Sequence, residues 1–159
     1  MNYDLSSLLH DSFASFANQM FTAIPCVIVE IPENLTDLRI HVKPVVNRKY
    51  KDGTSEEMDT MYNVPVLMQG SSTSMISFPL HVGDNVLCVF SQRSIESFKA
   101  GDGLPSTPRD FRKFSQLDAM AITGLYPFAK SINNPAVRKW QHNTQDLVVS
   151  HNIGQALET

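Results

Sequence analysis

The sequence has little cysteine: its two cysteines, Cys26 and Cys88, both lie in apolar runs. A buried free cysteine behaves as a small hydrophobic residue. We therefore expect two buried thiols rather than a disulfide, which suits assembly in a reducing cytosol.

Long apolar runs and blocks of like charge are also missing. No stretch of about 20 apolar residues is present, which excludes a membrane-spanning helix. No basic segment precedes an apolar core at the start, so we expect no signal peptide. The net charge of −3 argues against a large nucleic-acid surface. With 42% hydrophobic and 18% charged residues over 159 positions, we expect one soluble domain with extensions.

No motif of an enzyme or a cofactor site is present. The chain lacks the Gly-x-Ser-x-Gly turn of serine hydrolases and the glycine-rich loops that hold phosphates. Glu56, Glu57 and Asp59 form an acidic cluster, which we interpret as the solvated face of a polar strand. The histidines are too scattered for the short spacings of metal ligands. They are His10, His41, His81, His142 and His151. We expect no catalytic residue, metal or cofactor.

Short runs separated by turn residues follow one another between positions 24 and 90. Such runs, rich in β-branched residues, are typical of strands. The expected strands are Ile24–Ile31, Leu38–Pro44, Val45–Tyr50, a polar one near Glu57–Tyr62, Val64–Met68, Met75–Phe78 and Asp84–Phe90. Five or six strands in about 70 residues predict an all-β fold, a small OB-type barrel.

The strand at 84–90 is apolar on both faces. Val86, Cys88 and Phe90 point one way, and Leu87 and Val89 the other, because side chains alternate along a strand. We expect one face in the core and the other covered by a partner, a helix or a loop.

Residues 5–21 predict an amphipathic helix that begins after a capping Asp4. Its apolar positions are Leu5, Leu8, Leu9, Phe13, Phe16, Met20 and Phe21. This stripe either lies on its own domain or docks onto a neighbouring subunit.

The second half of the chain carries weaker signals. Ser115–Ile122 has helix-like spacing that Gly124 and Pro127 end. Residues 129–159 are Asn-rich and contain one strand candidate, Leu147–Ser150. We predict an N-terminal docking helix at 1–22, a barrel at 23–128 and an extended linker or stem at 129–159.

Three motifs in a fixed order resemble one family. They are V-P-V-L to F-P-L-x-V-G-D-x-V-L-x-V-F and R-S-I-E-S-F between positions 64 and 98, P-R-D-F-R-K-F-S at 108–115, and D-A-M-A-I-T-G-L-Y-P at 118–127. Together they resemble the N-terminal OB-type domain of central spike proteins, which sit at the baseplate of contractile-tailed bacteriophages. The likeness covers about Ile24 to Phe128, and it implies that 118–127 closes the barrel.

The resemblance implies a structural role in the virion, at the tail baseplate. The chain would be a homotrimer, with the tail hub above it and a spike tip or β-helical needle below. Only 31 residues follow Phe128, too few for a long needle. We therefore expect either that the tip is a separate protein or that Leu147–Thr159 forms a short stem that receives it. A chain that transmits force needs buried interfaces. The expected interface residues are Leu5, Leu9, Phe13, Phe16, Met20, Leu87, Val89, Phe111 and Phe114.

Two alternatives come from other classes. The first is an OB-fold module that binds single-stranded nucleic acid, because such sites combine exposed aromatic and basic residues. The residues that would carry it are Arg39, His41, Lys43, Arg48, Lys49 and Tyr50, with Phe111–Phe114 as a second patch. The second is a small hydrolase, which no motif supports.

Overall fold

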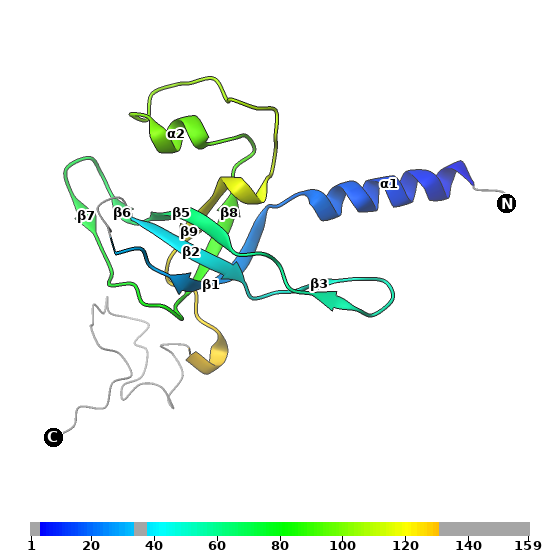
Figure 1. The fold of residues 1–159 in the computed structure, drawn as a ribbon, viewed down its shortest axis with the longest axis horizontal. Helices are drawn as coiled ribbons and strands as arrows, with labels where there is room; N and C mark the ends of the chain where they lie inside the picture. The colour runs from blue at the N-terminus through cyan, green and yellow to red at the C-terminus, as the bar shows by residue number, and fades with distance from the viewer. Residues whose placement is uncertain (1–3, 34–37, 131–159) are drawn as a thin grey trace, which may run out of the picture. The chain divides into compact units, whose positions relative to one another are not determined.

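The computed structural model describes residues 4–33 and 38–130 (Figure 1). Its elements in chain order are α1 (Leu5–Gln19), β1 (Ala23–Glu30), β2 (Arg39–Pro44), β3 (Arg48–Lys49), β4 (Ser55–Glu56), β5 (Met61–Leu67), β6 (Gln69–Gly70), β7 (Met75–Ile76), β8 (Asn85–Phe90), α2 (Glu96–Ala100), the 3₁₀ helix η2 (Gln116–Asp118), β9 (Ala119–Ile122) and the 3₁₀ helix η3 (Phe128–Lys130). The chain divides into two compact units between Thr123 and Gly124, and the first contains all of these elements except η3.

Five strands close into a barrel in the order β1-β2-β5-β9-β8. β8 pairs with β1, which completes the ring, and all neighbours are antiparallel except β5 and β9. β9 is inserted between two strands that precede it in the sequence. A five-stranded barrel with a Greek-key order is the OB type, so the predicted fold class is confirmed.

The core lies inside the barrel and follows from alternation along each strand. The buried side chains come from all five strands: Cys26, Ile28, Ile40, Val42, Met61, Val64, Val86, Cys88, Phe90, Ala119 and Ala121. Phe21 packs on its edge, with its ring centroid 5.1 Å from that of Phe90. Both cysteines are buried and free, as predicted. A hydrogen bond with the Cys88 side chain, together with burial, raises the pKa of the Cys26 thiol.

The middle of the barrel differs from the prediction. The expected strand at Glu57–Tyr62 is wrong, because β5 begins at Met61 and continues through the run that starts at Val64. Asn63 takes φ +54° within it, a conformation that asparagine tolerates better than most residues. The β2–β5 register shifts at this point: Ile40 pairs with Val64 and Val42 with Met61. The extra residue on β5 is a β-bulge, which joins two expected strands into one.

The expected helical segment Ser115–Ile122 is also wrong. Only Gln116–Asp118 is helical, as a 3₁₀ turn, and Ala119–Ile122 is the strand β9. Ala119 and Ala121 face the core, while Met120 and Ile122 face outward. β8 and β5 supply hydrogen-bonding partners on both edges, and such tertiary pairing overrides the local preference of alanine for helices.

Two short hairpins leave the barrel. β3 pairs with β4, and β6 with β7, so the expected strands Val45–Tyr50 and Met75–Phe78 are each shortened to two residues. The turn before β8 is tighter than either hairpin. Gly83 takes φ +97° there, a conformation that glycine adopts without strain. Its amide donates to Ile28 O at 2.8 Å, which fixes the entry into β8.

The N-terminal helix α1 begins at its predicted position, Leu5. Asp4 caps α1 by accepting a hydrogen bond from the Ser6 amide at 3.3 Å, and no residue of α1 is buried. Met20 ends the helix, and the Phe21 amide donates to Phe114 O at 3.0 Å. Within the described residues, no helix is long and apolar enough to cross a bilayer. The strand candidate Leu147–Ser150, His142 and His151 lie outside those residues.

Candidate functional site

The outer face of β8 forms an apolar surface together with its two neighbouring strands. Leu87 lies opposite Pro25 of β1 and Ile122 of β9. Val89 lies opposite Ala23 of β1 and Met120 of β9. Directly opposed residues share a face of the sheet. We call these six residues the β8 face: Ala23, Pro25, Leu87, Val89, Met120 and Ile122.

The β8 face carries no charge, and all of it except the exposed Ala23 is half-buried. The sequence identified Leu87 and Val89, but it missed the other members. The helix-like spacing of Ser115–Ile122 hides β9, so the sequence assigns the outward side chains of β9 to no sheet. A strand whose two faces are both apolar is typical of a covered position.

The apolar stripe of α1 is a second candidate surface. Leu5, Leu9, Phe13 and Phe16 are exposed, Phe13 by 72%, and Met20 is half-buried at the end of the helix. On the polar side, the Asp11 carboxylate lies 3.7 Å from Lys51 Nζ, with both side chains well exposed. The structure therefore leaves the stripe uncovered in the single chain.

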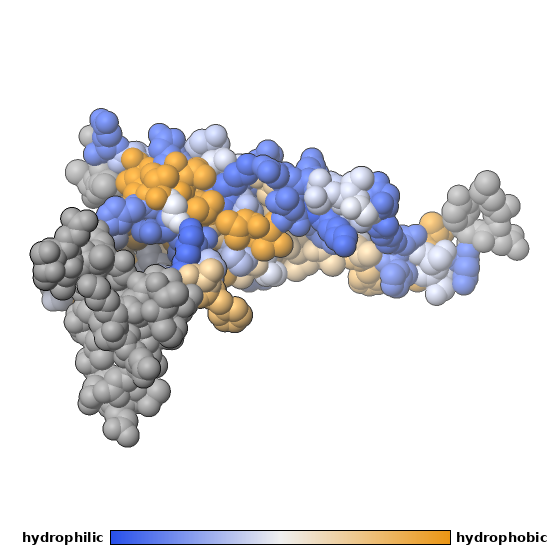
Figure 2. Space-filling model, turned by 90° about the horizontal axis from the view of Figure 1, so that it is seen from below, coloured by the Kyte–Doolittle hydropathy of each residue, from blue (hydrophilic) through white to orange (hydrophobic). Residues whose placement is uncertain are grey.

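Further apolar side chains are exposed around the β6–β7 hairpin. They are Leu67, Met75, Ile76 and Phe78. Figure 2 shows hydrophobic residues gathered in neighbouring patches on one face of the molecule, bordered by hydrophilic residues. Contiguous patches of this kind mark interaction sites more often than scattered single residues do.

The structure places the two predicted interface residues Phe111 and Phe114 in different environments. Phe111 is fully exposed, whereas Phe114 is half-buried and its carbonyl holds the Phe21 amide. Phe114 also takes φ +49°, which turns the chain between them. Phe111 is thus available for contact, and Phe114 serves the junction between α1 and the barrel.

Arg112, between these two residues, forms a clasp with Asp118. Arg112 Nε donates to Asp118 Oδ2 at 2.8 Å and Nη2 donates to Oδ1 at 3.0 Å, a bidentate pair. Asp118 is completely buried and also accepts from the Ile95 amide at 2.9 Å. Arg112 further contacts Asp110 at 2.5 Å and Glu96 at 3.1 Å. The clasp ties the long β8–β9 connection to the start of β9.

The electrostatics of the clasp favour its charged form. Burial opposes the ionisation of Asp118, but hydrogen bonds from Arg112 and the Ile95 amide outweigh that cost and hold the pKa of Asp118 below its usual range. Hydrogen bonds to Asp118 likewise raise the pKa of Arg112. Sequence reasoning placed Arg112 in a possible nucleic-acid patch, yet its guanidinium is committed to carboxylates of its own chain.

The lowered pKa of Asp118 predicts a loss of stability in acid. A carboxylate of this kind stabilises the fold above its unfolded pKa of about 4, and the contribution is lost as pH falls through the folded pKa. We expect the urea midpoint of the native chain to fall more steeply below about pH 4 than that of Asp118→Asn, which has no proton to gain there. Parallel curves for the two proteins would contradict this assignment.

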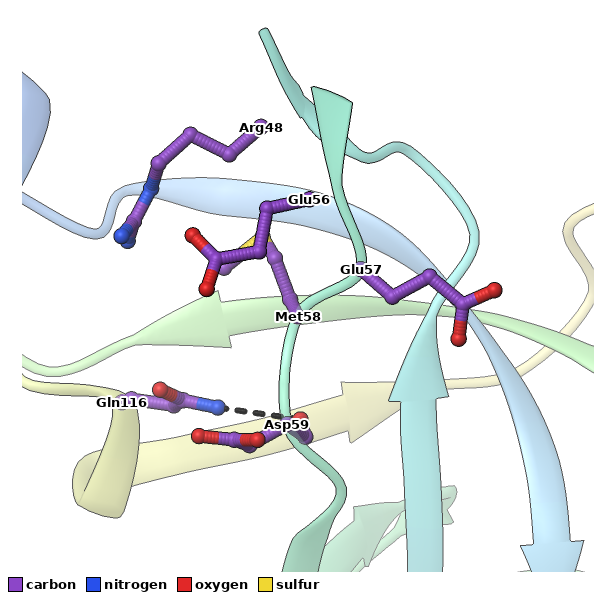
Figure 3. A pocket seen from close by; sticks show the side chains of 6 residues that line it. All are labelled: Arg48, Glu56, Glu57, Met58, Asp59 and Gln116. Atoms are coloured by element: carbon purple, nitrogen blue, oxygen red, sulfur yellow. Dashed lines mark hydrogen bonds between the residues drawn. The ribbon is translucent and has the colours of Figure 1, made fainter. Parts of the chain in front are cut away.

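The acidic cluster lines a small hollow beside the β3–β4 hairpin (Figure 3). Its lining residues are Arg48, Glu56, Glu57, Met58, Asp59 and Gln116, and its volume is about 80 Å³. Ligand pockets usually measure about 300–1,000 Å³, so this hollow has room for only a few waters. Gln116 Nε2 donates to Asp59 O at 3.1 Å, the hydrogen bond drawn in Figure 3.

Two of the three carboxylates of the hollow, those of Glu56 and Glu57, have partners within the chain. Glu57 points away from Arg48 and Glu56 (Figure 3) and pairs with Lys43 Nζ at 2.5 Å. This hydrogen bond lowers the pKa of Glu57. Tyr50 donates its hydroxyl to Glu56. The three acidic residues do not form a facing carboxylate pair, and the solvated-face interpretation is the one that the geometry favours.

The same contacts engage several of the basic and aromatic side chains that the nucleic-acid alternative would use. Lys43 and Tyr50 are engaged by Glu57 and Glu56, and the His41 ring stacks edge-on against Tyr62 at 5.0 Å. Within residues 4–33 and 38–130, no three His, Cys, Asp or Glu side chains gather as a metal site would require. The extended apolar surfaces are therefore the candidate functional site.

Comparison with known proteins agrees with a phage origin. The family model described as phage protein Gp138 N-terminal domain matches residues 24–124. This range runs from β1 through β9 and contains the barrel, the clasp and the whole β8 face except Ala23. No curated protein matches the chain. Because the match covers more than half of the sequence, the chain belongs to the family of phage proteins that carry the Gp138 N-terminal domain.

Proposed function

We propose that this chain is a structural subunit of the phage tail baseplate, the barrel part of the central spike that connects the tail hub to the piercing tip. In this proposal the chain works as a homotrimer, and its task is mechanical, with no catalytic step. Family membership supports a role in the phage particle. The motif resemblance to central spike proteins supports the more specific position.

The β8 face is the observation that carries the proposal. It is an uncharged surface made by three neighbouring strands of one closed barrel. The half-buried side chains at these outward positions still have apolar surface left to bury, and an obligate interface resembles a core that has been cut in half. Identical copies related by a closed rotation would cover one another's faces without leaving an unfilled end.

The nucleic-acid alternative has less support. Lys43, Tyr50 and Arg112 are engaged by carboxylates of the same chain, and a strand-binding groove needs such groups free to meet phosphates. Binding to single-stranded DNA that weakens steeply with salt would favour this alternative over the spike.

The proposal is tested by mass and by location. Light scattering of the purified chain at micromolar concentration is expected to give three times the chain mass of 17.8 kDa. In phage particles that carry an epitope-tagged copy, immunogold labelling is expected at the distal end of the tail. A stable monomer, or label on the capsid, would contradict the proposed function.

A further inference from the structure

We propose that α1 associates with α1 of the other copies, forming a parallel helical bundle that holds the subunits together. This inference rests on the proposed homotrimer, and it names the partner of the exposed stripe. A lipid surface, the alternative occupant, is an outcome of the test below.

The first support is that α1 cannot be stable by itself. It has 15 residues, none of them buried. Isolated helices of about 12–15 residues are marginal in water even for favourable sequences, and most helices in proteins depend on packing of an apolar face. The side chains of α1 therefore need a surface that the single chain does not supply.

The second support is the spacing of the stripe. Leu9, Phe13, Phe16 and Met20 follow one another at steps of four, three and four residues. This alternation is the a/d pattern with which helices pack against other helices. We call these four residues the seam. The seam covers only two heptads, which is too short to hold chains together without help from another contact.

The third support is the distribution of charge. No Asp, Glu, Lys or Arg flanks the seam: the flanking residues are His10, Ser12, Ala17 and Gln19. Asp11 lies on the outer side, where it approaches Lys51 at 3.7 Å. Parallel copies would thus bring no like charges together at the seam. A lipid-binding helix carries Lys or Arg beside its apolar face, and α1 contains neither.

The apolar area that α1 can bury also favours a bundle that acts together with the barrel. Phe13 and Phe16 still expose 72% and 63% of their surface, so each has on the order of 100 Å² left to bury. The whole stripe then supplies on the order of 500 Å² per chain, below the roughly 800 Å² per partner of a standard interface. The β8 face would supply the remainder.

The connection between the two surfaces makes this cooperation effective. Only Met20, Phe21 and Thr22 separate α1 from β1. Phe21 is held by the Phe90 ring and the Phe114 carbonyl. Once barrels associate, this short link keeps the helices at high effective concentration, so a weak seam suffices to complete the bundle.

The test uses cysteine cross-linking in the full chain, with Phe16→Cys on the seam and Asn18→Cys on the opposite side. Cys26 and Cys88 are completely buried, so they do not react in the native protein. Under oxidised glutathione, we expect Phe16→Cys to give disulfide-linked dimers, with the third copy unlinked, and Asn18→Cys to remain several-fold less linked. Position 16 meets itself only in a parallel bundle in register.

Each other result counts against a stated part of the proposal. A trimeric mass with no cross-link at position 16, or with equal cross-linking at both positions, overturns the helical bundle and leaves the homotrimer standing. A monomeric mass overturns the homotrimer and the bundle together. Co-sedimentation of the native chain with vesicles of anionic phospholipid, lost in Phe13→Glu, identifies a lipid occupant and also overturns the bundle.

Discussion

Replacement of Arg112 by leucine is expected to lower the free energy of unfolding by about 3–5 kcal/mol, the cost of breaking a buried ion pair from one side. Asp118 is completely buried, and Arg112, only 19% exposed, supplies two of its three hydrogen bonds. Without the guanidinium, the carboxylate stays in the interior with the Ile95 amide as its remaining hydrogen-bond donor. The measurement is the urea midpoint at neutral pH.

Matched variants separate the ion pair from other effects. Lys113→Leu removes one positive charge from an exposed neighbour and is expected to change stability by less than about 0.5 kcal/mol. Arg112→Lys keeps the charge but loses the bidentate geometry, so its stability should lie between those of the two leucine variants. Asp118→Asn added to Arg112→Leu should recover part of the loss. Equal stability of Arg112→Leu and Lys113→Leu would show that the clasp contributes nothing.

The second large effect is expected at two adjacent positions of β8. Val86→Asp places a carboxylate inside the barrel, where Val86 is 1% exposed, and should prevent folding. Leu87→Asp places the same group on the β8 face, which is half-buried in one chain. We expect this variant to remain folded and to lose the trimer, because each copy would bring an unpaired charge, costing about 3–5 kcal/mol, into the interface.

Circular dichroism and light scattering distinguish the two outcomes. Ser55→Asp, in the exposed β4, is the control for added charge and should stay folded and trimeric. If Leu87→Asp retains the trimeric mass, the subunits do not meet through the β8 face. If it unfolds as Val86→Asp does, Leu87 belongs to the core of the single chain.

Alternation made several strands predictable from the sequence alone. β1, β2 and β8 carry apolar residues at alternate positions, and these inward side chains belong to the core: Cys26 and Ile28, Ile40 and Val42, and Val86, Cys88 and Phe90. β9 could not be recognised this way. Its inward residues, Ala119 and Ala121, are buried but small, and alanine is depleted in strands. Only the family resemblance indicated that this segment closes the barrel.

The clasp was missed for a related reason. Arg112 lies in a segment without regular secondary structure between Ala100 and Gln116, and Asp118, six residues further on, ends η2. No single periodicity therefore brings them together. Asp118 becomes buried only when η2 leads into β9. The same limit applies to the β8 face, since cross-strand neighbours depend on register. Sequence patterns identify the face of a strand, but they do not identify its neighbours.

The parallel pairing of β5 with β9 also constrains how the chain folds as it is synthesised. β9 fills the gap between β5 and β8, which are already complete when it emerges. Until Ile122 has left the ribosome, those two strands have unpaired edges facing each other. Contacts of such long sequence separation form slowly, and an unpaired strand edge is a template for pairing with another chain. We therefore expect the open barrel to pair with other chains more readily than the barrel that β9 has closed.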